Sequence, residues 1–485
     1  MRSRPVGSTD PGFARLWEPL LEGHALVSLM SPYRKLQDHA ARLIHVERQV
    51  GEITDRLAQL AANVDQLRRL TERGAANAAL AARRTHPVAP YRVLFLVHHP
   101  EAWYSLADVY AGMASAPDFD TLVASIPRWF PGASGHQDEG RAHDALTGWG
   151  VPHVRFNHED SFADLTVARA FAPDVIFRQS QWDPDVPAAF ATAELTFARL
   201  CLVPYETMSL IETPVDDGEL NPSYDCPYYR SAWRVFHANP MIRSVALRHA
   251  VSANPGHHVV TGHPKADVIT RALASAEPEP QRPFTVLWSP HHSITDEWNR
   301  FGTFHQTAFE MVNLAKLHPD WHFVLSMHPA LVTRIDNPAP PLTHDFVERF
   351  RTQWSQLPNT EFFPGGDYAP LFAHSDALVS DGLSWLLEYQ FAKKPVIFLE
   401  RPDHRRFNDV GERALSGVTR VRSVDEAADL LEGLAAGRTH DLRSEQDQIV
   451  EQLFGAPGAA DRIIAAIRDG LTAESAAAVT SDLHQ

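Results

Sequence analysis

The sequence predicts an α/β protein made of two doubly wound lobes behind a long N-terminal helix. From Tyr91 onward, short apolar runs alternate with amphipathic stretches, which is typical of parallel sheets covered by helices. A linker at 274–283, rich in Pro and Glu, divides this alternation into two series. Before Tyr91, apolar residues recur every seven positions, as in coiled coils. We therefore expect Rossmann-like lobes at 90–270 and 284–470, preceded by a coiled-coil helix at 35–86.

Composition restricts the class of protein. A chain of 485 residues is too long for one hydrophobic core. The formal net charge of -16 argues against nucleic acid as a partner, because phosphate backbones select basic surfaces. Two cysteines exclude a disulfide framework and a zinc site built from cysteines. Since no signal peptide or run of about 20 apolar residues is present, we expect a cytoplasmic protein that can contact the inner membrane face peripherally.

The N-terminal part carries two patterns. Residues 1–34 combine apolar residues with few charges and can form an amphipathic helix, on a membrane or packed on its own domain. Two seams of a heptad repeat follow: Leu36, Leu43, Val50, Leu57 and Val64 in one, and Val46, Ile53, Leu60 and Leu67 in the other. A stripe only two-sevenths wide favours a coiled coil over a helix folded back on the body. A homo-oligomer through residues 36–67, most simply a parallel dimer, is therefore expected.

The first lobe is predicted from residue 91 onward. Strands are expected at 92–97, 121–125, 153–156, 174–178 and 200–204, and helices at 103–114, 138–149 and 162–170. His98 and His99 follow the first strand, at the edge where ligands of doubly wound sheets bind. They are also interpretable as a polar loop that starts a helix. Asp183-Pro184-Asp185 is interpreted as a turn and not as a metal motif.

The second lobe repeats the pattern. Strands are expected at 285–288, 321–326, 360–363, 377–379 and 396–399, with helices at 304–317, 346–354, 369–373 and 383–393. Further helices run to about residue 470, and the Ala- and Ser-rich tail at 472–485 is expected to be disordered.

The stretch at 376–400 reads as strand, polar turn, helix and strand. Asp381 or Ser384 is expected to cap the helix, and Glu388 lies one turn beyond Ser384 on the same face. Amides following Asp381, including that of Gly382, can hold phosphate oxygens at the helix start. The alternative is an ordinary capped helix in an α/β sheet.

Five motifs in the C-terminal half resemble those of the CDP-glycerol glycerophosphotransferase family, which comprises teichoic acid primases and polymerases. They span roughly residues 230–410: Thr261 to Asp267, Trp288 to His292, Met327 to Pro329, Ser380 to Tyr389 and Lys394 to Phe398. The resemblance implies the two-lobed glycosyltransferase B fold. The family's His-Gly-Thr-Pro loop is replaced here by Tyr205-Glu206-Thr207-Met208, and the helical N-terminus is additional to the transferase core.

Together, the resemblance and the residue chemistry suggest two sets of site residues. Donor-binding candidates are His291, His292, His328, Asp381, Gly382, Ser384, Glu388 and Arg405. Catalytic candidates are His99, His98, Glu206 and His292, with His99 favoured as the base and Glu206 as its orienting partner or substitute. His-Pro turns and a solvated loop at 401–406 are the structural alternatives. No metal and no cofactor are expected.

The sequence thus predicts a transferase that moves glycerol phosphate, or a similar polyol phosphate, from a CDP-linked donor to a cell-surface polymer or lipid-linked acceptor. Because this fold serves many donors, a glycosyltransferase that uses a nucleotide sugar is an alternative. A coiled-coil scaffold with inactive transferase lobes is the other, and the missing His-Gly-Thr-Pro loop favours it.

Overall fold

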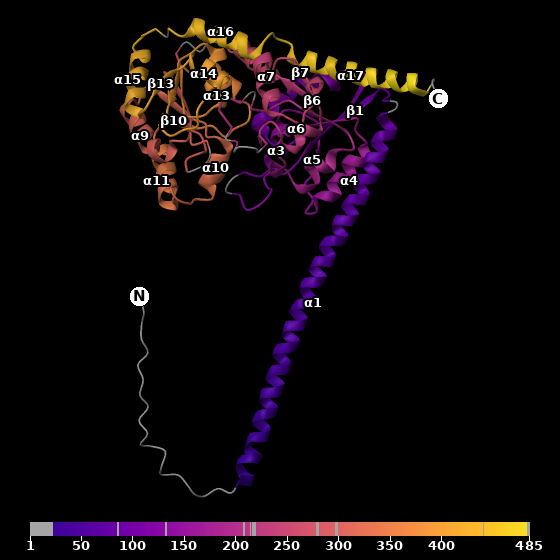
Figure 1. The fold of residues 1–485 in the computed structure, drawn as a ribbon. Coiled ribbons are helices and arrows are strands. Elements are labelled where there is room, and N and C mark those ends of the chain that lie inside the picture. The colour runs from indigo at the N-terminus through magenta and orange to yellow at the C-terminus, as the bar shows by residue number, and fades with distance from the viewer. Residues whose placement is uncertain are drawn as a thin grey trace, which may run out of the picture. The chain divides into compact units, whose positions relative to one another are not determined.

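A computed structural model describes residues 23–84, 87–130, 133–206, 209–213, 215, 220–277, 281–295, 299–439 and 441–482 (Figure 1). The chain forms two compact units, Met1–Gly74 and Ala75–Gln485. The second unit contains both lobes. Among the described helices, none combines the length and the apolarity that a membrane crossing requires.

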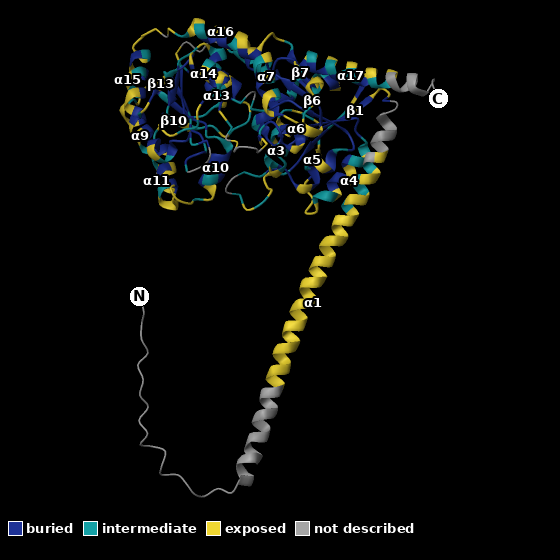
Figure 2. Ribbon diagram, in the orientation of Figure 1, coloured by how far each residue is buried: buried dark blue, intermediate teal, exposed yellow. Residues whose placement is uncertain are grey.

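The first unit consists of most of helix α1 (Gly23–Arg84), which confirms an N-terminal helix. Along its described side chains both heptad seams are exposed, with values from 52% at Val46 to 63% at Leu43 and Leu67 (Figure 2). The expected amphipathic segment at 1–34 lies largely outside the described residues. Oligomerisation through α1 remains a prediction.

The first lobe is a seven-stranded parallel sheet in the order β3-β2-β1-β4-β5-β6-β7. Its strands are β1 Tyr91–Val97, β2 Phe119–Ser125, β3 Val154–Arg155, β4 Val175–Arg178, β5 Arg199–Leu202, β6 Ala232–His237 and β7 His258–Val260. Its helices are α2 Ala107–Ala114, α3 Glu139–Gly148, α4 Ser161–Phe171, α5 Thr192–Leu195, α6 Pro227–Ser231, α7 Pro240–His249 and α8 Pro264–Ser275. The strand order reverses between β1 and β4, so a crevice is expected at the carboxyl ends of these two strands.

The second lobe is a six-stranded parallel sheet in the order β10-β9-β8-β11-β12-β13. Its strands are β8 Thr285–Ser289, β9 His322–Leu325, β10 Thr360–Phe362, β11 Ala377–Ser380, β12 Val396–Leu399 and β13 Thr419–Val421. Its helices are α9 Phe304–Leu317, α10 Pro329–Asp336, α11 His344–Ser355, α12 Ala369–His374, α13 Ser384–Glu388, α14 Asp409–Leu415, α15 Val424–Ala435 and α16 Arg443–Phe454. In this sheet the strand order reverses between β8 and β11. The loops that follow these two strands carry several candidate site residues, among them His291, His292 and Gly382.

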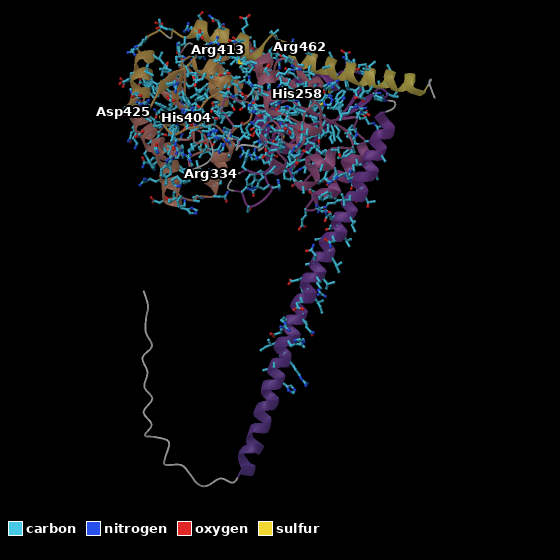
Figure 3. The ribbon with its side chains drawn as sticks, in the orientation of Figure 1. His258, Arg334, His404, Arg413, Asp425 and Arg462 are labelled. Carbon is cyan, nitrogen blue, oxygen red and sulfur yellow. The ribbon has the colours of Figure 1, made fainter. Side chains whose placement is uncertain are left out.

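The C-terminal helix α17 (Ala459–Asp482) returns to the first lobe. Ile463, Ile464 and Ile467 are buried in the same core cluster as Val93 of β1. Arg462, labelled in Figure 3, donates from Nε to the Thr261 carbonyl oxygen at 2.8 Å.

The prediction that the second lobe extends to residue 470 is therefore wrong for α17. The disordered tail from 472 is also wrong as far as Asp482, because the helix continues there. Burial of the apolar face of α17 against the first lobe, starting at Ile463, supplies the packing that stabilises a helix of ordinary propensity.

The helix expected at 383–393 is divided in two. Regular α-helix covers only α13, and a 3₁₀ segment, Tyr389–Ala392, follows it. Lys393 then adopts a left-handed conformation with φ of 54°, which ends the helical stretch before Pro395. Leu383 occupies the N-cap position without a side-chain hydrogen bond, so capping by Asp381 or Ser384 is wrong.

Candidate substrate-binding cleft

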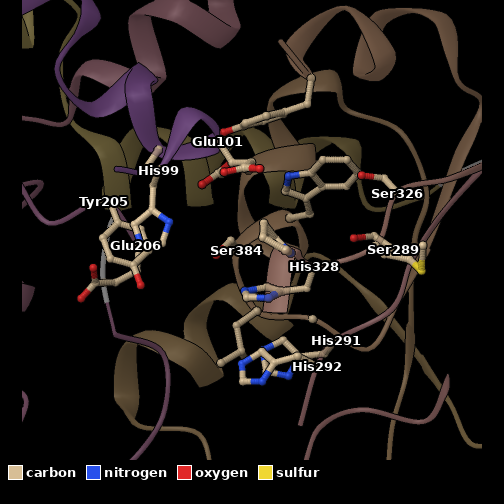
Figure 4. A pocket seen from close by; sticks show the side chains of 18 of the residues that line it. His99, Glu101, Tyr205, Glu206, Ser289, His291, His292, Ser326, His328 and Ser384 are labelled. Atoms are coloured by element: carbon tan, nitrogen blue, oxygen red, sulfur yellow. Dashed lines mark hydrogen bonds between the residues drawn. The ribbon is translucent and has the colours of Figure 1, made fainter. Parts of the chain in front are cut away.

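A cavity of about 330 Å³ lies between the two lobes, at the switch points of both sheets. Its size lies within the range of small-molecule sites. From the first lobe, the lining includes His99, Glu101, Phe130, Arg141, Trp182, Tyr205, Glu206 and Lys265. From the second lobe, it includes Ser289, His291, His292, Ser326, His328, Tyr368, Gly382, Ser384 and Glu388. Figure 4 shows His99, Tyr205 and Glu206 on one side, with His291, His292 and His328 on the other.

Three histidines cluster on the second-lobe wall. His291 and His292 follow β8, and His328 follows β9 at the start of α10. The ring centroid of His328 lies 5.2 Å from that of His291 and 4.5 Å from that of His292. Two of the three rings have a defined tautomer, which determines what they can bind.

Backbone amides define these tautomers. The Nδ1 atom of His328 accepts from the amide of Ala330 at 3.1 Å. The Nδ1 atom of His291 accepts from the amide of Ser293 at 3.3 Å, and the Ser293 hydroxyl lies 2.7 Å from it. A neutral imidazole with an accepting Nδ1 carries its proton on Nε2. Both Nε2 atoms are therefore hydrogen-bond donors.

Burial also keeps these rings neutral. It lowers the pKa of His328 to about 4, and that of His291 falls well below its ordinary value for the same reason. Two neutral N–H donors on one wall suit the oxygen atoms of a phosphate group, without the need for a formal positive charge.

Asp381 lies behind this wall and does not line the cavity. Its carboxylate accepts from the amides of His291 and Thr303, both at 2.5 Å, and from the Thr303 hydroxyl at 2.7 Å. Asp381 therefore holds the loop that presents His291, and its part in donor binding remains a prediction. Gly382 and Ser384, beside it, do line the cavity.

Glu388 lines the cavity and also joins the lobes. Its carboxylate accepts from Lys265 Nζ at 2.9 Å and from the Tyr368 hydroxyl at 2.5 Å. Lys265 belongs to α8 of the first lobe, whereas Glu388 ends α13 of the second. Because only 1% of Glu388 is exposed, this is a buried ion pair between lobes. Removal of one partner leaves the other charge buried without compensation.

We expect Glu388→Ala to lower the free energy of unfolding by about 3–5 kcal/mol, since the Lys265 ammonium loses its charged partner. Glu388→Gln keeps an oxygen acceptor for Lys265 and should lose less. Urea unfolding of both variants measures the difference, with Glu348→Ala on the exposed face of α11 as the control. Equal stability of the Ala and Gln variants would contradict the importance of the ion pair.

The first-lobe wall is built on the loop after β1. The amides of His98 and His99 both donate to Gln179 Oε1 at 2.8 Å, and Gln179 Nε2 donates to the His99 carbonyl oxygen at 3.0 Å. Gln179 follows β4, so it fixes the loop at the switch point. The His99 ring lines the cavity, whereas His98 is buried outside the lining.

His99 and Glu206 present unsatisfied atoms on this wall. His99 Nε2 and Glu206 Oε2 are buried and have no hydrogen-bond partner among the described residues. The other oxygen of Glu206 accepts from Gln181 Nε2 at 3.0 Å. Burial lowers the pKa of His99 well below its ordinary value and raises the pKa of Glu206. His99 Nε2 accepts a hydrogen bond from a ligand when the ring carries its proton on Nδ1, and Glu206 Oε2 accepts one when the carboxyl group is ionised.

Several lining residues had no signal in the sequence. Glu101 accepts from Arg128 at 3.2 Å and from Arg141 at 3.3 Å. Tyr368, whose hydroxyl donates to the Glu388 carboxylate, also lines the cavity. Arg405, a donor-binding candidate, is not among the described residues that line the cavity.

Two groups of residues have the composition of metal sites. His291, His292 and His328 form one group. In His291 and His328, however, Nδ1 accepts from a backbone amide and Nε2 carries a proton, so neither nitrogen has a lone pair available for a metal ion. His98, His99 and Asp185 form the other, with candidate ligand atoms within 4.8 Å of one another. The Asp185 carboxylate already accepts from the Ser180 hydroxyl at 2.5 Å. Asp185 was interpreted only as a turn residue, and the fold brings it to the histidines.

No protein-family model and no curated protein matches the sequence. Solved structures do match. The match with a structure of a variant of the wall teichoic acid polymerase TagF, soaked with CDPG, covers 85% of this chain and 99% of the TagF chain, with a TM-score of 0.54 and 14% sequence identity. The S. aureus MnaA-UDP structure covers 79% and 97%, with a TM-score of 0.52 and 14% identity. UDP-GlcNAc 2-epimerase from Neisseria meningitidis, bound to UDP-GlcNAc, covers 78% and 100%, with a TM-score of 0.52 and 14% identity.

The chain therefore has a two-lobed fold of the glycosyltransferase B type, and this confirms the expected fold class. Identities of this size establish the fold alone.

Proposed function

We propose that this protein is a transferase that moves glycerol phosphate, or a similar polyol phosphate, from a CDP-linked donor to a cell-surface polymer or lipid-linked acceptor. The observation that carries the proposal is the cavity between the lobes. It has neutral N–H donors on its second-lobe wall and, on its first-lobe wall, two buried polar atoms without a partner among the described residues, His99 Nε2 and Glu206 Oε2. The likeness to a TagF structure soaked with CDPG supports a CDP-linked donor.

In this proposal the second lobe binds the donor. The Nε2–H groups of His291 and His328 donate to the pyrophosphate, and the Ser384 hydroxyl adds a further donor on the same wall. Glu388, which lines the cavity, is the acceptor for a ribose hydroxyl.

The first lobe then binds and activates the acceptor. An acceptor hydroxyl oxygen attacks the phosphorus that bears the glycerol, the bond from that phosphorus to CMP breaks, and CMP leaves. His99 Nε2 takes the hydroxyl proton. The pKa of His99 is low in the free protein, and the negative charge of the transferring phosphate stabilises the imidazolium as it forms in the transition state. Glu206, with its raised pKa, is the alternative base.

A transferase or other enzyme that acts on a UDP-linked sugar is the second candidate. Structures of this fold with UDP and with UDP-GlcNAc favour it. A scaffold with inactive lobes is disfavoured by the buried, unsatisfied His99 and Glu206 atoms, because such atoms are costly unless a ligand satisfies them.

Thermal shift and calorimetry with CDP-glycerol, CDP, UDP and UDP-GlcNAc test the donor. A ligand at 100 times its Kd stabilises the native state by about 2.7 kcal/mol. We expect the largest shift with CDP-glycerol, and the same shift after treatment with EDTA, because no metal is expected. A preference for UDP-GlcNAc would favour the second candidate, and no nucleotide binding would favour the scaffold.

The affinity for CDP-glycerol is expected to be nearly constant from pH 6 to pH 8.5. If the histidines bound the ligand as cations, they would lose a proton as the pH rises through about 6.5, and the affinity for the ligand would fall. Since burial places the pKa of His328 at about 4, its ring is already neutral throughout this range. Calorimetry at several pH values is the measurement. The diester pyrophosphate of this ligand does not itself titrate there.

His328→Ala should weaken CDP-glycerol without weakening cytidine, with exposed His344→Ala as the control. A steep fall in affinity between pH 6 and pH 7.5 would instead show that the histidines bind as cations.

A further inference from the structure

The first-lobe half of the cavity presents to a ligand buried polar atoms that have no partner in the described part of the chain. His99 Nε2 and Glu206 Oε2 are both buried, both belong to lining residues, and neither has a partner among the described residues. A buried polar atom without a partner is costly, so native proteins keep one chiefly where a ligand or water satisfies it. Two such atoms in the lining favour a ligand with several O–H groups, because a hydroxyl group can both donate and accept a hydrogen bond.

Aromatic side chains surround these acceptors. The ring centroid of His99 lies 4.9 Å from that of Phe130 and 5.4 Å from that of Tyr205. The ring centroids of Trp182 and Tyr205 lie 6.2 Å apart, in an edge-to-face arrangement. All of these residues line the cavity. Flat, largely apolar surfaces with a few polar atoms suit the C–H faces of a sugar ring, whose hydroxyl groups project from its edge.

The charges on the lining disfavour an anion here. Among the described lining residues the cations are Arg141 and Lys265, and each already pairs with a carboxylate. Arg141 is bound to Glu101, and Lys265 is bound to Glu388. A phosphate group next to Glu206 would find no free cation and would face a carboxyl group. The second-lobe wall differs, because its histidines present N–H groups.

We propose that the group bound next to His99 and Glu206 is an uncharged sugar that presents a free hydroxyl, and not the phosphate-bearing end of a growing chain. This inference rests on the proposed function and specifies its acceptor. The sugar hydroxyl donates its proton to His99 Nε2 as its oxygen forms the new bond to phosphorus, and CMP leaves. Tyr205 and Trp182 hold the ring, and Glu206 accepts from a second hydroxyl.

Saturation-transfer NMR on the CDP-loaded full chain tests the inference. The probes are methyl glycosides of the common hexoses and N-acetylhexosamines, with sn-glycerol 3-phosphate as the anionic probe. We expect saturable binding of at least one neutral glycoside and no competition from sn-glycerol 3-phosphate. Binding of sn-glycerol 3-phosphate in place of the glycosides, or no glycoside binding at all, would overturn the inference.

Variants connect the binding to this half of the cavity. Tyr205→Leu and Glu206→Gln should each weaken the glycoside at least tenfold, while His257→Ala, on the opposite edge of the sheet before β7, leaves it unchanged. Tyr205→Phe keeps the ring and should retain most of the binding, which separates stacking from misfolding. Unchanged glycoside affinity in both Tyr205→Leu and Glu206→Gln would also overturn the inference.

Calorimetry with CDP-glycerol on the same samples distinguishes the two proposals. Loss of nucleotide binding alone counts against the proposed function. Loss of glycoside binding with normal nucleotide binding concerns only the identity of the acceptor.

Discussion

Replacement of His99 by Ala should lower kcat about 100- to 10,000-fold while the affinity for CDP-glycerol stays near normal. A sugar or polyol hydroxyl is too weak an acid to attack phosphorus unaided at neutral pH, and a positioned base contributes about this factor. The substitution should leave the loop in place, because Gln179 holds it through backbone atoms of His98 and His99. The rate of CMP formation at saturating substrate gives kcat, and calorimetry measures donor binding.

Three comparisons make this result specific. His257→Ala, before β7, controls for the loss of a histidine elsewhere in the lobe. Glu206→Gln tests the alternative base: a loss in this variant alone, with an active His99→Ala, would move the role to Glu206. Full activity in both variants would move it to His292. Lost nucleotide binding in His99→Ala would show that His99 acts on the donor.

The combined Leu57→Glu and Leu60→Glu variant should be monomeric, whereas the parent chain should have twice the chain mass of 54.1 kDa or more. Leu57 is 61% exposed and Leu60 is 58% exposed, one from each heptad seam. An isolated helix cannot bury them, and a second copy of the same helix buries both seams at once. Light scattering coupled to size exclusion measures the mass.

A matched variant, Gln59→Glu with Ala62→Glu, adds the same charge at positions off both seams. It should remain oligomeric. A monomeric parent chain, or dissociation of both double variants alike, would refute the coiled-coil interface. Residues 36–67 lie outside the two lobes, so nucleotide binding is expected to be unchanged in all of these proteins.

Ten of the thirteen strands of the described residues, and their division between two lobes, could be predicted from the sequence, whereas β6, β7 and β13 were missed. Buried parallel strands consist largely of continuous apolar residues, and polar residues mark their carboxyl ends, such as Ser380 as the last residue of β11 and His98 directly after β1. The position of His99 and His291 near the same cleft also followed, because ligands bind at the switch points of such sheets.

Contacts between distant segments could not be predicted. Lys265 and Glu388 are 123 residues apart, and nothing local to either residue indicates its partner. The amphipathic pattern of α17 predicts a buried face but does not identify the surface that covers it. Asp381 was one of two residues expected to cap the helix, but its carboxylate instead accepts from the amides of His291 and Thr303, which lie in the loop between β8 and α9.

The return of α17 to the first lobe decides how this protein can be divided for experiments. A fragment that ends at Phe454 would expose part of the apolar core of the first lobe, because Ile463, Ile464 and Ile467 would be missing from it. A fragment with the second lobe through residue 470 would carry that same apolar face into solvent and invite aggregation. Halves suitable for separate expression must therefore be cut on both sides of the second lobe, at 276–284 and at 455–458, with α17 joined to the first lobe by a synthetic linker.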